Sequence, residues 1–89
     1  MTYTVVLLPA EEGGYTVLVP ALPGCVTEGD TLTDALLMVE DAIAGYLAVL
    51  AEDGDPPPTE GPEISVRLGE CREALIRKVS VRQPVPEYA

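Results

Sequence analysis

Cys25 is the side chain in this sequence that most invites a chemical role, because a thiolate becomes a strong nucleophile once a neighbouring base activates it. The chain contains no histidine, and neither lysine nor arginine lies near Cys25 in the sequence. Without such a partner the thiol is expected to act as a small buried apolar side chain. Cys71 lies far along the chain and no CxxC pair is present, so two reduced structural cysteines are predicted.

Carboxylates are the second group of side chains that could support chemistry. Asp30 and Asp34 precede and open a long apolar-rich segment, and Glu40 and Asp41 lie within it. A metal-dependent nuclease could use such groups, but Glu40 and Asp41 fall on the polar side of a helical pattern and Asp34 suits a helix cap. The absence of histidine from the sequence also excludes the commonest acid-base residue and most kinds of zinc site. We therefore predict no catalytic residue, no metal site, no cofactor and no enzyme activity.

The charges are distributed unevenly along the chain. Residues 1–66 carry twelve acids and no base, whereas the remainder carries five bases and three acids. An acidic body repels nucleic-acid phosphates and attracts a basic partner. The bases that remain as candidates for nucleic-acid contact are Arg72, Arg77, Lys78 and Arg82. Because no aromatic residues are interleaved with them, a polar surface used in oligomer assembly is the competing interpretation.

The composition indicates a single globular domain with a partner. The chain has 89 residues, of which 47% are apolar, and this is more apolar surface than one small core needs. We therefore expect burial against another chain, with a homo-oligomer as the simplest case. Neither a run of about 18 apolar residues nor a basic leader is visible, so a cytoplasmic protein without a membrane span is predicted.

The patterning predicts an α+β fold. Two aliphatic and β-branched runs, 3–8 and 15–19, flank a Glu-Glu-Gly-Gly turn that is typical of a hairpin. A short third strand is predicted at Cys25–Glu28. Thr31 then provides an N-cap for a helix whose apolar residues recur at three- and four-residue spacing up to Leu50. Gly54 and the prolines at 56–58 end it.

The remaining strands are assigned from alternation. Glu63–Leu68 alternates apolar and polar residues and is predicted to be the fourth strand, placed beside the first by a right-handed crossover. The sheet order would then be 3-2-1-4, with the helix covering one face. Residues 70–79 have some helix propensity, but the alternation around Leu75–Arg82 favours a possible fifth, C-terminal strand.

Several short motifs in fixed order resemble the HicB-like antitoxins. They are Glu-Gly-Gly-Tyr at 12–15, Val-Pro-Ala-Leu-Pro-Gly-Cys at 19–25 and Glu-Gly-Asp-Thr-Leu at 28–32, followed by a similar helix end at 46–54. The resemblance covers roughly residues 1–66 and implies a partial RNase H-like β-β-β-α-β domain without nuclease activity. Residues 1–68 would form this domain and residues 69–89 a short basic extension.

The resemblance implies an antitoxin of a type II toxin-antitoxin module. Such a protein would bind a small basic HicA-like toxin and block its mRNA cleavage by occlusion and charge complementarity. The carboxylates expected to contact the toxin, at the hairpin tip and strand ends, are Glu11, Glu12, Glu28 and Asp30. Residues 69–89 are too short for the DNA-binding module that many members carry, which weakens the case for operator binding. The alternative is a solitary oligomer or a regulator that binds nucleic acid through its basic C-terminal segment.

Overall fold

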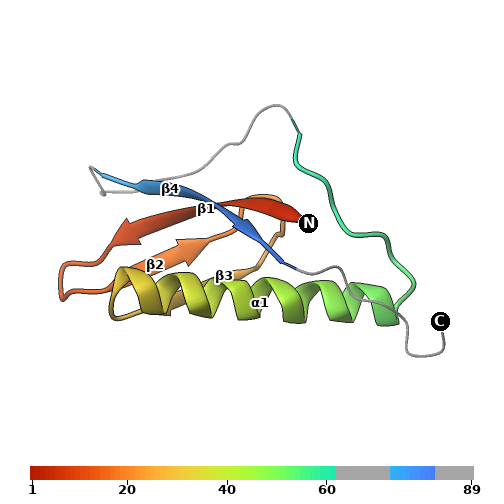
Figure 1. The fold of residues 1–89 in the computed structure, drawn as a ribbon, viewed down its shortest axis with the longest axis horizontal. Helices are drawn as coiled ribbons and strands as arrows, with labels where there is room; N and C mark the ends of the chain where they lie inside the picture. The colour runs from red at the N-terminus through yellow and green to blue at the C-terminus, as the bar shows by residue number, and fades with distance from the viewer. Residues whose placement is uncertain (62–72, 82–89) are drawn as a thin grey trace.

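The fold is one antiparallel sheet with a long helix packed along one face (Figure 1). The computed structural model describes residues 1–61 and 73–81. Within them the sheet order is β3-β2-β1-β4, which confirms the predicted α+β class and strand order. The elements are β1 (Thr2–Pro9), β2 (Tyr15–Leu18), β3 (Val26–Gly29), α1 (Leu32–Glu52) and β4 (Leu75–Ser80).

The strand on the side of β1 away from β2 is not the segment predicted to lie there. β4 pairs antiparallel with β1, from Thr2 opposite Ser80 to Leu7 opposite Leu75. The C-terminal strand therefore forms and takes the fourth position, while Glu63–Leu68, predicted for that place, lies outside the described residues. Glu63–Leu68 alternates polar and apolar residues strictly, whereas Leu75–Ser80 reads Leu-Ile-Arg-Lys-Val-Ser, so periodicity favoured the earlier segment. The crossover rule that favoured the earlier segment applies to parallel strands, whereas β4 is antiparallel to β1.

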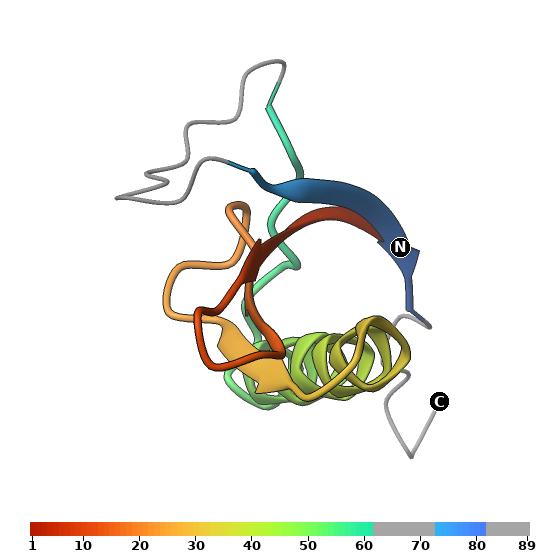
Figure 2. The ribbon, with the colours of Figure 1, turned by 90° about the vertical axis from the view of Figure 1, so that its left-hand side faces the viewer.

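The core lies between α1 and the sheet face that it covers (Figure 2). Alternate residues of a strand point to one face, and residues four apart in a helix share a side, so each element contributes one buried row. Full burial of such a side chain stabilises the fold by about 1.5–3 kcal/mol. The rows are Tyr3, Val5 and Leu7 from β1, Val17 from β2, Ala35, Val39, Ile43 and Leu47 from α1, and Val79 from β4.

Gly29 fixes where α1 begins relative to the sheet. A Cβ built on Gly29 would lie 2.4 Å from the backbone nitrogen of Ala35, and one on Gly14 would lie 2.7 Å from the carbonyl oxygen of Gly29. Both approaches are closer than side-chain carbons tolerate. The hairpin turn, the end of β3 and the first turn of α1 are thus pressed together where the sequence has glycine.

Both ends of α1 are capped as predicted. The Thr31 hydroxyl accepts a hydrogen bond from the Asp34 N–H at 3.0 Å, satisfying one donor of the first turn. At the other end Gly54 takes a positive φ of 76°, and the Asp55 N–H donates to the Leu50 carbonyl at 2.9 Å. This glycine-based cap ends the helix and turns the chain back toward the sheet.

Residues 55–61, which we call the strap, follow the end of α1 and run past the N-terminal half of β1 (Figure 1). The buried Tyr3 hydroxyl donates to the Pro58 carbonyl at 2.6 Å. β1 pairs with β2 only from Val6 onward, so the Thr4 N–H on that edge has no strand partner. The Glu60 carboxylate accepts this N–H, and it also accepts the Thr4 hydroxyl at 3.1 Å.

Lys78 completes the Glu60 network. Its ammonium group donates to the Thr4 hydroxyl at 2.7 Å and to the Glu60 carboxylate at 3.3 Å. Burial by itself raises the pKa of Glu60, but the hydrogen bonds from Thr4 and Lys78, together with the Lys78 charge, outweigh it and hold the pKa below its usual value. Glu60 therefore ties the strap to β1 and β4 in its ionised form.

Candidate functional site

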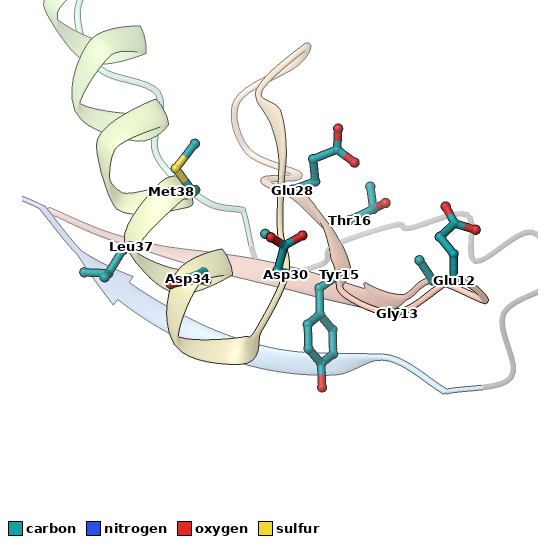
Figure 3. A pocket seen from close by; sticks show the side chains of 11 residues that line it. Glu12, Gly13, Tyr15, Thr16, Glu28, Asp30, Asp34, Leu37 and Met38 are labelled. Atoms are coloured by element: carbon teal, nitrogen blue, oxygen red, sulfur yellow. The ribbon is translucent and has the colours of Figure 1, made fainter.

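An open hollow of about 680 Å³ lies between the β1–β2 hairpin, the edge strand β3 and the first turns of α1 (Figure 3). Four of its lining side chains are carboxylates and none is a base. We call it the acidic hollow. Its lining residues are Ala10, Glu12, Gly13, Tyr15, Thr16, Glu28, Gly29, Asp30, Asp34, Leu37 and Met38.

The carboxylates reach the acidic hollow from three elements. Glu12 comes from the hairpin turn, and Glu28 lies on β3 opposite Thr16 of β2. Asp30 follows β3 directly, and Asp34 lies in the first turn of α1. Figure 3 shows Asp30 between the helix side and the side formed by Glu28 and Thr16. The close approach of Gly29 to Ala35 brings residues 28–34 around one hollow.

The helix contributes the apolar part of the acidic hollow. Leu37 and Met38 are 60% and 49% exposed, although most leucines and methionines of a domain this size are buried. In the described part of the chain the ion pair present joins Lys78 to Glu60, so the carboxylates of the hollow face no cation there. A lysine or arginine of a partner fits this arrangement, with its aliphatic stem on Leu37 and Met38 and its charged head among the carboxylates.

The predicted contact residues are partly brought together. Glu12, Glu28 and Asp30 line the acidic hollow, whereas Glu11 is exposed in the same turn without lining it. Sequence reasoning missed Leu37 and Met38. Their positions fall between the buried residues of the helical pattern, and that spacing was the available signal for two exposed apolar side chains.

The predicted basic cluster is not assembled on one face within the described residues. Arg77 and Lys78 are adjacent in β4, so their side chains point to opposite faces of the sheet. Lys78 is engaged by Thr4 and Glu60, and Arg77 is exposed and donates to a neighbouring carbonyl. Arg72 and Arg82 lie outside the described residues.

Cys25 lies in the core and is 6% exposed. Burial raises the pKa of its thiol, which disfavours the reactive thiolate. The prediction of a structural cysteine is confirmed for Cys25, while Cys71 lies outside the described residues. Tyr46 packs against the core while partly exposed, and its hydroxyl donates to the Pro23 carbonyl at 3.0 Å.

Metal and membrane sites were also sought in residues 1–61 and 73–81. There, no three histidine, cysteine or acidic side chains gather closely enough to hold a metal ion. Within the same ranges, no helix has the length and hydropathy needed to cross a bilayer.

Sequence comparison matches residues 3–75 to the family described as HicB_like antitoxin of bacterial toxin-antitoxin system. The chain is 41% identical over 63 residues to the UPF0150 protein Ta0767 of Thermoplasma acidophilum, covering 71% of this chain and 91% of that protein. It is 44% identical over 62 residues to antitoxin HicB 1 of Photorhabdus laumondii, covering 70% of this chain. That match spans 40% of the Photorhabdus protein, so this chain corresponds to less than half of the length of that antitoxin.

Solved structures show the same fold. The N-terminal domain of the Burkholderia pseudomallei antitoxin HicB superposes with a TM-score of 0.70 at 28% identity, covering 92% of this chain and 99% of that one. A toxin-antitoxin complex from Streptococcus pneumoniae contains a chain with a TM-score of 0.75 at 20% identity, covering 92% and 69%, a likeness in fold alone. From the family match over residues 3–75, the chain belongs to the HicB-like antitoxin family.

Proposed function

We propose that the protein is an antitoxin that binds a small, basic HicA-like toxin in the cytoplasm and inhibits its mRNA cleavage by covering the toxin's surface. The observation that carries the proposal is the acidic hollow, whose four carboxylates lie beside exposed Leu37 and Met38 and include no base. Membership of an antitoxin family supports it, and so does the occurrence of this fold in a toxin-antitoxin complex. The family consists of antitoxins, which agrees with the expectation that the chain is not an enzyme.

Charge would act first in such an encounter. The net charge of −10 attracts a basic protein over roughly a Debye length, about 8–10 Å at physiological salt. Each exposed ion pair contributes little alone, roughly 0–1 kcal/mol. The affinity must therefore also come from apolar contacts at the centre, with the carboxylates of the hollow setting orientation and association rate.

The experiment compares two variants with the same change in charge. Glu28→Gln with Asp30→Asn removes two carboxylates from the acidic hollow, and Glu40→Gln with Asp55→Asn removes two exposed carboxylates elsewhere. The partner is the basic protein recovered with the tagged chain from its native cells, and inhibition of its RNA cleavage is titrated with each variant. We expect the hollow variant to need at least about tenfold more protein for half inhibition than the control. Equal inhibition by the two variants would refute the assignment of the hollow.

We also propose that the protein self-associates through the sheet face opposite α1. The registers place Val26, Leu18, Val6 and Ile76 in one aliphatic row across all four strands. Val26 and Ile76, at the two ends of the row, are 56% and 55% exposed. A second copy would bury them, consistent with the excess of apolar residues in the sequence.

A further inference from the structure

The face of α1 that points away from the sheet is unusually apolar. Its buried residues recur at 35, 39, 43 and 47, so positions near 37, 41, 45 and 48 lie on the opposite side. A helix on a protein surface normally carries charged residues there. In this chain Leu37, Met38 and Val49 are 60%, 49% and 58% exposed. We call the six exposed residues Leu37, Met38, Asp41, Gly45, Ala48 and Val49 the outer stripe.

Gly45 lies near the middle of the outer stripe, and because it has no side chain the surface is recessed there. Glycine is less favourable than alanine in a helix interior, and close packing inside the chain does not explain it, because a Cβ on Gly45 would meet no atom within 4 Å. With Ala48 one turn further on, the middle of the stripe presents almost bare backbone. No described segment covers this side of α1 (Figure 2). Another helix could therefore approach α1 closely at Gly45 while contacting Leu37 and Val49 on either side.

The charges decide which partner fits the outer stripe. All charged side chains of α1 are acidic, namely Asp34, Glu40, Asp41 and Glu52. A second copy docked through the same stripe would bring two sets of carboxylates together with no cation from either helix. A partner helix with lysine or arginine flanking an apolar strip would match both the apolar residues and the carboxylates.

We propose that the outer stripe is the docking surface for a basic amphipathic helix of a partner protein. The stripe spans about 18 Å of helix, from Leu37 to Val49. It is continuous with the acidic hollow, because Leu37 and Met38 belong to both. The inference rests on the proposed function in one respect: the helix that docks belongs to the toxin that the hollow orients.

The first test uses a defined probe instead of the toxin. The probe is an 18-residue amphipathic peptide of leucine, alanine and lysine, and its control has the same composition in an order that destroys the apolar strip. Both are titrated into the ¹⁵N-labelled full chain. We expect the amide shifts that change to lie on the outer stripe, with binding of the amphipathic peptide alone. Shifts centred on the sheet, or no binding by the wild-type chain, would overturn the proposal.

Matched variants provide the second test. Leu37→Gln with Val49→Gln removes apolar area from the outer stripe, and glutamine is a good helix former, so the fold should persist. Val26→Gln with Ile76→Gln removes equally exposed residues from the sheet. We expect the first pair to weaken peptide binding at least about tenfold and the second by less than about twofold. Equal effects, or a wild-type dimer that the first pair dissociates, would overturn the proposal.

The same variants separate this inference from the antitoxin function. If the captured basic protein is inhibited equally by wild type and by Leu37→Gln with Val49→Gln, the docking surface is wrong and the function stands. If the wild-type chain inhibits no such protein, the function fails, whatever the peptide shows.

Discussion

Replacing Glu60 with alanine should destabilise the fold although Glu60 lies in the strap, outside the helix and the sheet. Its carboxylate accepts the backbone N–H and the hydroxyl of Thr4, a residue that is only 5% exposed. Without Glu60 the Thr4 N–H on the edge not covered by β2 loses its partner, and an unsatisfied buried donor costs about 1–3 kcal/mol. Lys78 adds little, because its side chain is 65% exposed. We expect a loss of about 2 kcal/mol, or roughly 8–16 °C in Tm for a domain of this size.

The pH dependence provides an independent check on the Glu60 network. Because the pKa of Glu60 is lowered in the fold, its contribution is complete above the pKa it has in the unfolded chain and is lost as pH falls through the lower folded-state value. The difference in free energy of unfolding between wild type and Glu60→Ala should thus be largest at neutral pH and should shrink in strong acid. This difference is measured by urea unfolding, followed by far-UV circular dichroism, at neutral pH and in strong acid. The exposed Glu52→Ala is the control and should change stability by less than about 0.5 kcal/mol. Equal stability of Glu60→Ala and Glu52→Ala at neutral pH would refute the reasoning.

Three other variants, two single and one double, test the packing described above. Gly45→Ala should raise stability by about 1 kcal/mol, or roughly 4–8 °C in a thermal scan, because its Cβ meets no atom within 4 Å; a lower Tm would mean that the site is crowded. Gly29→Ala should cost at least about 2 kcal/mol in urea unfolding, since its Cβ would lie 2.4 Å from the Ala35 nitrogen, and an unchanged midpoint would contradict the close contact between β3 and α1. Val26→Lys with Ile76→Lys should shift the oligomer toward monomer in light scattering after gel filtration, whereas an unchanged mass would exclude the outer sheet face as the interface.

The parts of the fold that depend on local chemistry were predictable from the sequence. The hairpin, the Thr31 cap and the glycine stop of α1 each arise from a few neighbouring residues whose backbone preferences are strong. The apolar spacing of the helix also predicted its buried side. These signals were sufficient for the α+β class and for the neighbours β1 and β2, whereas the segment in the fourth place of the sheet was assigned by a crossover argument and differs.

The parts that depend on contacts between distant segments were not predictable. Glu63–Leu68 has the clearer alternation, yet Leu75–Ser80 is the segment that pairs with β1. The role of Glu60 depends on where β2 stops pairing with the edge of β1. The sequence around Glu60 contains no pattern that indicates this position. Likewise, three of the predicted contact carboxylates share the acidic hollow because Gly29 lets β3 and α1 meet. Glu11, which also carries a carboxylate and lies in the same turn, does not line the hollow.

The most direct test of the central claim is the inhibition of RNA cleavage by the purified chain. The tagged protein is captured from its native cells at low salt, and the protein that co-elutes is released at raised salt and assayed on mRNA with and without added chain. We predict a small basic protein in near-equal amount, whose RNA cleavage stops at about one equivalent of the chain and resumes as salt rises. Recovery of the chain alone, or RNA cleavage that the added chain leaves unchanged, would contradict the antitoxin function.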